Sequence, residues 1–357
     1  MKRNVFLFWA VVCAGAIILP RGVYARGQAP AGSSEAAGIP AANEDENYVV
    51  KIGRGVTAGL CGAPYFIAET LGYYEEEGLK WEAVFQSTGE SQMNLTTGKT
   101  DVGSGLLATT IQPLANGFDI KIPLGIHTGC QKVLVKKNSG INRAADLKGK
   151  KIGTSGMAAS STVITQRTLA NLGIGVAPPN LEVDFVIFQA SDLPLAISTG
   201  QVDAIALGDP TAYLAELEHD LKVIINQATD DYLKDEFCCM VQLRTGFYLE
   251  HPKAAAKFVR AIQRAAAFVQ ENPEKTAELL AEAKHVAGDP KVNAEILKTY
   301  NYKASVSEAR KAISRNVNDL KRIGIIKDDI DGDELTNRVF VALDGVPDNL
   351  YGNPPAK

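Results

Sequence analysis

Four of the chain's five cysteines lie in three short segments, one of which also holds a histidine. Cys61 lies in GLCGAP, His127 and Cys130 lie in HTGC, and Cys238 and Cys239 are neighbours in FCCM. Thiolate and imidazole are the donors that soft metal ions prefer, paired cysteines form disulfides in oxidising compartments, and small buried cysteines are common in cores. Adjacent cysteines bond to each other only through a strained turn. Three interpretations stay open: a disulfide, a site for a soft metal or metal complex, or inert buried thiols.

A run of small residues, TSGMAASS, precedes an expected helix that ends near Gly173. The unpaired N–H groups and the dipole at a helix start favour an anionic group, and serine hydroxyls add hydrogen-bond donors. The alternative is an ordinary capped helix in tight contact with its sheet. The residues concerned are Ser155, Gly156, Met157, Ser160 and Ser161.

Asp209 complicates a site for a simple anion, because a carboxylate repels one. It suits a ligand that carries an amine, or an arginine partner within the protein. The dipeptide Asp209–Pro210 is also typical of a helix start.

One phrase occurs twice, as TTGKTDVGSG at 96–105 and as STGQVDAIALGDP at 198–210. We interpret it as one strand–helix unit present in each of two similar lobes. A glycine, Gly98 or Gly200, ends a short helix, and an aspartate, Asp101 or Asp203, begins the next strand. We expect both aspartates to be structural. The residues after each strand are better candidates, because ligands of open parallel sheets bind beyond the carboxyl ends of the strands.

Strands alternate with helices from Tyr48 to about residue 226, and the chain then becomes mostly helical from about residue 251. This alternation predicts parallel sheets covered by helices, an α/β fold. The formal net charge of −4 and the absence of a basic stripe give a nucleic-acid partner no support. KDDIDGDELTNR is rejected as a calcium loop, since Lys327 and Arg338 occupy the first and last ligand positions.

The N-terminus has the pattern of an export signal. MKRN is basic, VFLFWAVVCAGAIIL is apolar but short for a membrane span, and GVYA ends at Ala25 with small residues that a signal peptidase reads. Residues 1–25 are therefore predicted as a signal peptide, with an uncleaved or lipid anchor as the alternative. Residues 26–47, rich in Gly, Ala, Pro, Ser and acids, are predicted as a disordered linker.

Five segments together resemble bacterial periplasmic substrate-binding proteins of ABC importers, in the nitrate/sulfonate/taurine group. They are PYFIAETLGYYEEEGL, GESQMNLTTGKTDVGSG, DLKGKKIGTSGMAASS, ASDLPLAISTGQVDAIALGDP and FVRAIQRAAAFVQENPEKTAELL. None is decisive alone, but all five stand in the order and spacing of that group. The resemblance spans Tyr48 to about Ile325.

The resemblance implies a type II periplasmic-binding-protein fold, with two α/β lobes joined by a two-strand hinge and a mostly helical C-terminal extension. Lobe one would comprise 48–128 and 244–357, and lobe two 132–240. Crossing strands in such folds lie side by side, so Cys130 could pair with Cys238 or Cys239, or a soft metal site could use Cys61, His127, Cys130, Cys238 and Cys239. The implied ligand-binding residues are Leu60, Cys61, Ala63, Pro64, Ser87, Thr88, Glu90, Ser104, Gly105, His127, Cys130, Ser155, Gly156, Met157, Ser160, Ser161, Asp192 and Asp209.

The function implied is capture of a small organic solute, sulfonate-like, taurine-like, nitrate-like or heterocyclic, and its delivery to an ABC permease and its ATPase. We expect a monomeric, exported, periplasmic or extracytoplasmic protein that is either free or tethered to the membrane. We expect no enzyme activity and no cofactor. The alternatives are a fold-related pyrimidine-synthesis enzyme, or a protein that binds a metal or metal complex through His127 and the cysteines.

Overall fold

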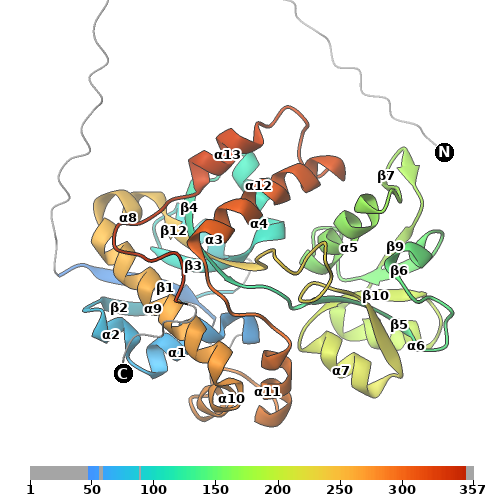
Figure 1. Ribbon diagram of the computed structural model, residues 1–357, viewed down its shortest axis with the longest axis horizontal. Helices are drawn as coiled ribbons and strands as arrows, with labels where there is room; N and C mark the ends of the chain where they lie inside the picture. Colours follow the sequence, from blue (N-terminus) through green and yellow to red (C-terminus); the bar gives the residue numbers. More distant parts are fainter. Residues whose placement is uncertain (1–46, 56–58, 88–89, 351–357) are drawn as a thin grey trace, which may run out of the picture. The chain divides into compact units, whose positions relative to one another are not determined.

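Two five-stranded sheets organise the part of the chain that the structure describes. The computed structural model describes residues 47–55, 59–87 and 90–350, and Figure 1 shows their helices and strands. The predicted signal peptide 1–25 and all but the last residue of the predicted linker 26–47 lie outside these ranges. No helix within the described ranges is long and apolar enough to cross a membrane.

The first sheet consists, in spatial order, of β2 (Lys80–Phe85), β1 (Val49–Arg54), β3 (Val102–Leu106), β12 (Cys239–Arg244) and β4 (Ile120–His127). β1 pairs in parallel with β2 and β3, whereas β12 is antiparallel to both β3 and β4. The sheet is thus mixed, not purely parallel as the alternation of strands and helices predicted. The exceptional strand, β12, is the one that enters from the other sheet.

The second sheet repeats this plan. It consists of β9 (Asp184–Ile187), β6 (Lys151–Thr154), β10 (Ala204–Gly208), β5 (Gln131–Lys136) and β11 (Leu221–Asn226). Strands β6, β9, β10 and β11 take the places that β1, β2, β3 and β4 have in the first sheet. β5 takes the place of β12, and it too is antiparallel to its neighbours and enters from the other sheet. The two lobes, each built on one sheet, therefore share one strand order.

Helices cover both sheets (Figure 1). Those of the second lobe are η3 (Ala144–Leu147), α5 (Ser160–Asn171), η4 (Ala190–Asp192), α6 (Leu193–Ser198) and α7 (Thr211–Glu218), beside the short hairpin β7 (Val176–Ala177) and β8 (Asn180–Leu181). Those of the first lobe are η1 (Leu60–Gly62), α1 (Ala63–Thr70), α2 (Tyr73–Glu76), α3 (Ser91–Thr96), α4 (Leu107–Ala115), α8 (Thr245–Glu250), α9 (Pro252–Glu271), α10 (Pro273–Glu282), α11 (Pro290–Lys298), α12 (Val306–Arg322) and α13 (Gly332–Val339).

One apolar core continues from the first lobe into the second. Buried side chains of α4, β4 and α12, such as Ile111, Ile122 and Ile313, belong to the same cluster as Val133 of β5 and Ile152 of β6. Separate cores lie between the first sheet and α1 and α9, and between the second sheet and α6 and α7. The lobes are thus joined by shared packing as well as by the two crossings of the chain.

The two crossings, 128–130 and 227–238, are hydrogen-bonded to each other and to the strands beside them. The amide of Cys238 donates to the carbonyl of His127 at 2.9 Å, and the amide of Gln227 donates to the carbonyl of Gln131 at 3.0 Å. Cys239 pairs with His127 in the ladder of β12 and β4. The expected side-by-side arrangement of the crossings is present in the structure.

The duplicated phrase forms the same local structure in both lobes. Gly98 and Gly200 have φ angles of 75° and 76°, a left-handed conformation that suits glycine after a short helix. Asp101 Oδ2 accepts the amide of Lys51 at 3.0 Å, and Asp203 Oδ2 accepts the amide of Lys151 at 2.9 Å. Each aspartate fixes the start of the adjacent strand, as expected of a structural residue.

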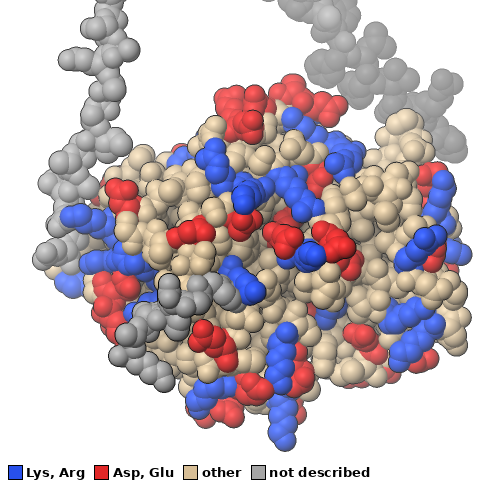
Figure 2. Space-filling view, viewed as in Figure 1, with Lys and Arg blue, Asp and Glu red and all other residues tan. Residues whose placement is uncertain are grey.

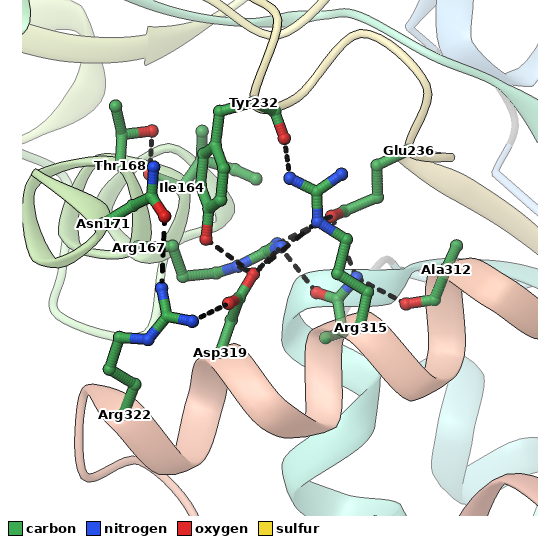
Figure 3. A network of polar contacts seen from close by, with 11 residues as sticks. Ile164, Arg167, Thr168, Asn171, Tyr232, Glu236, Ala312, Arg315, Asp319 and Arg322 are labelled. Carbon is green, nitrogen blue, oxygen red and sulfur yellow. Dashed lines mark hydrogen bonds and ion pairs between the residues drawn. The ribbon is translucent and has the colours of Figure 1, made fainter.

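A buried ion network joins α5 of the second lobe to α12 of the first and to the second crossing (Figure 3). The fully buried guanidinium of Arg167 lies 2.6 Å from Glu236 Oε1, 2.7 Å from Asp319 Oδ2 and 2.8 Å from Asn316 Oδ1. The hydroxyl of Tyr232 donates to Asp319 at 2.7 Å. This network therefore links the second lobe to the first through buried charges.

Charges of both signs are interspersed over the face drawn in Figure 2. Ion pairs of the described residues include Arg260 with Glu77 at 2.7 Å and Lys298 with Glu274 at 2.8 Å. The face carries no continuous field of one sign.

Candidate functional site

The two crossings and the η1 turn bring thiol and imidazole side chains together. Cys61 lies in η1, His127 ends β4, and Cys130 follows three residues later with a φ of 84°. One ligand atom from each of these three side chains lies within 4.8 Å of the other two. His127 and Cys130 are buried, whereas Cys61 is partly exposed. The predicted convergence of these residues is present.

The thiols form a chain of contacts around Cys61. The Cys130 and Cys239 thiols donate to Cys61, and this holds the pKa of the Cys61 thiol well below its usual range. Burial raises the pKa of the Cys130 thiol well above its usual range. Cys130 Sγ lies 3.0 Å from Cys238 Sγ, and all four thiols are free in the structure. Cys130 therefore faces Cys238 on one side and Cys61 on the other.

His127 is held by stacking and by one hydrogen bond. Its ring lies 5.4 Å from that of Tyr300, nearly parallel, and 5.2 Å from that of Tyr302. Its Nδ1 lies 3.2 Å from the carbonyl oxygen of Thr128. Because a carbonyl can only accept, this bond forms with the tautomer that carries the proton on Nδ1 and leaves the lone pair on Nε2. Nε2 is buried and has no hydrogen-bond partner among the described residues.

Asp209 has a partner within the protein, and it is a lysine. Lys132 Nζ lies 2.9 Å from Asp209 Oδ2, with both side chains buried. Asp209 Oδ1 also accepts the amide of Tyr213 at 3.0 Å, which anchors the start of α7. The internal partner is thus a lysine and not the arginine that was considered, and a role of Asp209 in ligand binding stays a prediction. Burial raises the pKa of Asp209 from its usual range, against the lowering effect of Lys132.

Of the predicted ligand-binding residues in the first loop, three pack in the core and one, Cys61, belongs to the thiol cluster. Leu60, Ala63 and Pro64 are buried in the core. The carbonyl of Leu60 accepts the hydroxyl of Tyr302 at 2.7 Å, which ties η1 to the ring that contacts His127. These three residues hold Cys61 in position, and their side chains contribute apolar surface alone.

The second and third loops of the first lobe are occupied with local contacts. Glu90 Oε2 accepts the amide of Ser87 at 2.8 Å and its hydroxyl at 2.9 Å, and these bonds lower the pKa of Glu90. Thr88 lies outside the described residues. Ser104 is exposed and Gly105 partly buried in β3, where a Cβ at residue 105 would clash with the Gln242 side chain.

The helix start of the second lobe forms where predicted, with α5 beginning at Ser160. Ser160 and Ser161 are buried, and the Ser161 hydroxyl donates to the carbonyl of Ala206 in β10 at 3.2 Å. Ser155 and Met157 are exposed, and Gly156 is partly buried. Asp192 is exposed and accepts the hydroxyl of Ser191 at 3.1 Å. Ser161 therefore serves the packing of α5 on its sheet.

Sequence reasoning did not find the aromatic and basic side chains that surround this cluster. Tyr300 and Tyr302 arrive from the loop after α11, more than 160 residues from His127. Lys132 follows Cys130 by two residues and is buried in β5. A lysine followed by the apolar residues VLV of a strand was the one signal available, because a buried charge needs a partner.

The family model described as NMT1/THI5 like matches residues 62–276, which is more than half of the chain. The chain belongs to the NMT1/THI5-like family. The match includes both crossings and the whole second sheet, and therefore His127, Cys130, Cys238 and Cys239, whereas Cys61, Tyr300 and Tyr302 lie outside it.

Curated relatives of this NMT1/THI5-like protein fall into two functional groups. A Bacillus subtilis protein named as an aliphatic sulfonates-binding protein is 28% identical over 269 residues, which cover 73% of this chain and 77% of that protein. A Legionella pneumophila 4-amino-5-hydroxymethyl-2-methylpyrimidine phosphate synthase is 26% identical over 227 residues, covering 62% and 69%. Fungal relatives carry the same synthase name. The expectation that the chain is not an enzyme is therefore contradicted, since its relatives include enzymes.

Solved structures confirm the predicted fold. The periplasmic aliphatic sulphonate binding protein SsuA of Escherichia coli matches with a TM-score of 0.67 and 19% identity, covering 80% of this chain and 96% of that one. This NMT1/THI5-like chain thus has the periplasmic-binding-protein fold, with two α/β lobes.

Proposed function

We propose that this protein is the extracytoplasmic solute-binding component of an ABC-type importer. It captures a small organic solute, sulfonate-like or heterocyclic, between its two lobes and delivers it to a membrane permease and its ATPase. The observation that carries the proposal is the pair of like lobes joined by two adjacent crossings, in a chain similar to a sulfonates-binding protein. The lobe boundaries 48–128 with 244–357, and 132–240, are part of this proposal.

Buried polar groups at the junction support a ligand there. Five polar atoms on or beside the crossings have no hydrogen-bond partner among the described residues, and buried polar groups generally have one. A bound solute would satisfy several of them at once. The atoms belong to His127 (Nε2), Thr128 (Oγ1), Gln227 (Oε1), Tyr300 (Oη) and Asn301 (Oδ1).

A thermal-shift screen over a library of sulfonates, taurine, nitrate and heterocycles tests the proposal. A solute at about a hundredfold its Kd stabilises the native state by about 3 kcal/mol, so binders raise the midpoint clearly. Calorimetric titration with a hit then gives the affinity. Tyr300→Phe, which removes one unpartnered hydroxyl but keeps the ring, should weaken binding, whereas Tyr248→Phe on α8 should not. A library without a single binder would contradict the proposal.

Export belongs to the same proposal and has its own test. The supporting features are the basic, apolar and small-residue segments of 1–25 and the fold shared with periplasmic proteins. Fractionation of a bacterial host that expresses the full chain should recover the protein outside the cytoplasm. N-terminal sequencing should find cleavage after Ala25, and retention of residues 1–25 would favour an anchor.

The synthase relatives give a second candidate function, a role in pyrimidine phosphate formation. Within the chain, the supporting feature is the buried Nε2 lone pair of His127, which can take part in acid–base chemistry. Expression in a bacterial strain that requires the pyrimidine should restore growth if this function holds. A binding protein would not restore it.

A further inference from the structure

The donor atoms of Cys61, His127 and Cys130 lie at a separation that one metal ion can bridge. Zinc lies about 2.3 Å from a thiolate sulfur and about 2.0–2.1 Å from an imidazole nitrogen. Two sulfurs of one ion therefore lie at most about 4.6 Å apart. The three donors already lie within 4.8 Å of one another. Binding would require the three donor atoms to move closer together.

The imidazole of His127 is oriented so that one ring nitrogen can bind a metal ion. The bond from Nδ1 to the Thr128 carbonyl leaves the lone pair on Nε2, and this is the state in which histidine binds metals. Nε2 is buried and has no hydrogen-bond partner among the described residues. Because it does not reach the protein surface, bulk water does not supply that hydrogen bond. The stacked ring of Tyr300 fixes the plane of the imidazole. This orphaned atom is evidence independent of the cysteines.

We propose that Cys61, His127 and Cys130 bind one thiophilic metal ion at the junction of the two lobes, with a water molecule as the fourth ligand. Binding of a divalent ion would release one proton from each coordinating thiol, and two thiolates would neutralise its charge. Lys132 and Asp209 already neutralise each other nearby, so no further charge is left unbalanced. Partly exposed Cys61 offers the side from which the ion enters. The proposal does not depend on the solute-binding function.

Oxidation of Cys130 with Cys238 is the competing chemistry. Their sulfurs lie 3.0 Å apart, and a two-electron oxidant such as a disulfide-forming thiol oxidase would join them with loss of two protons and two electrons. Cys130 would then be unable to bind a metal. The two proposals thus exclude each other and predict different thiol counts.

Zinc titration of the reduced, chelator-treated full chain tests the metal site. Cys13→Ser is included throughout, so that the remaining thiols are the four of the junction. Competition against a chromophoric chelator should give one Zn²⁺ per chain. Cys61→Ser and His127→Gln should each weaken this binding by about 100-fold, whereas the exposed His219→Gln should leave it unchanged. Unaltered binding in Cys61→Ser or His127→Gln would overturn the proposal.

Two further measurements keep the proposal testable if a variant does not fold. Co²⁺ bound to the unmutated chain should give thiolate charge-transfer absorption and the visible bands of a four-coordinate site, and Cu(I) should compete for it. Bound Zn²⁺ should protect Cys61 from alkylation, as read by mass spectrometry. Weak Co²⁺ bands of an oxygen-ligated ion, unprotected Cys61, or a Cys130–Cys238 disulfide in the isolated protein would each refute the site. Solute screening of the metal-free chain separates this result from failure of the transport proposal.

Discussion

Asp101 and Asp203 occupy the same place in two sheets but have different surroundings. Asp101 is buried, and its carboxylate accepts from the amide of Lys51, the hydroxyl of Tyr48 at 2.8 Å and the guanidinium of Arg244 at 2.7 Å. Asp203 is exposed, and its carboxylate accepts the Lys151 amide. The repeated local bond is the same, but only the first copy also holds a long-range ion pair.

This difference predicts unequal effects of the same substitution. Asp101→Ala leaves Arg244 and Tyr48 without their acceptor, so we expect a loss of about 3 kcal/mol in the free energy of unfolding. Asp203→Ala removes one exposed bond, and the loss should be clearly smaller. Urea unfolding followed by circular dichroism measures both. Equal losses would mean that the strand-start bond, not the ion pair, carries the energy.

Lys132 and Asp209 form a second pair whose value depends on both partners. Both side chains are buried, and the Lys132 ammonium lies 5.4 Å from the centroid of the Tyr213 ring. A buried ion pair adds little to the free energy of unfolding compared with apolar residues of the same size. A buried charge without its counter-ion, however, lowers that free energy strongly. The pair is therefore expected to matter for how the site is shaped more than for net stability.

A double-mutant cycle checks this expectation. Lys132→Met alone should lower the free energy of unfolding by about 3 kcal/mol, because Asp209 stays buried without its counter-ion. Lys132→Met with Asp209→Leu should recover most of that loss. Chemical unfolding of the four proteins gives the coupling free energy. Additive losses would show that the two charges do not stabilise each other.

At the scale of elements, the sequence predicted where strands and helices alternate, and it predicted the role of the duplicated aspartates. It could do so because these features depend on local periodicity and turn chemistry. The burial of polar side chains on α5 could not be predicted from the sequence. Thr162, Thr165, Gln166 and Arg167 are all buried, although a helix buried on all sides is normally apolar. The partners of Arg167 lie on α12 and the second crossing, far along the chain.

The α5–α12 network gives a prediction at this scale. Arg167→Ala leaves Glu236 and Asp319 buried without their common cation, so we expect a loss of about 4 kcal/mol in the free energy of unfolding. The surface pair of Arg143 and Asp146 is the matched control, and Arg143→Ala should have no measurable effect. Thermal and urea unfolding compare the two variants. A neutral Arg167→Ala would show that Arg315 and Arg322 can replace it.

At the scale of the whole molecule, two like lobes could unfold separately or together. Two covalent crossings alone would allow independent unfolding of the lobes. The shared core changes this, because Ile313 on α12 packs in one cluster with Val133 and Ile152 of the second sheet. Burial of one such side chain is worth about 1.5–3 kcal/mol, so the shared core outweighs a buried ion network that nearly breaks even.

We therefore predict one cooperative unfolding transition for both lobes. With Trp9 replaced by Phe, Trp81 on β2 is the sole tryptophan, and its fluorescence reports the first lobe. Far-ultraviolet circular dichroism reports both lobes, and the two urea curves should coincide. Ile313→Ala should shift both curves together by about 3 kcal/mol. If Trp81 fluorescence and circular dichroism separated in the Trp9→Phe protein with Ile313 intact, the lobes would be independent units and the shared core too weak to couple them.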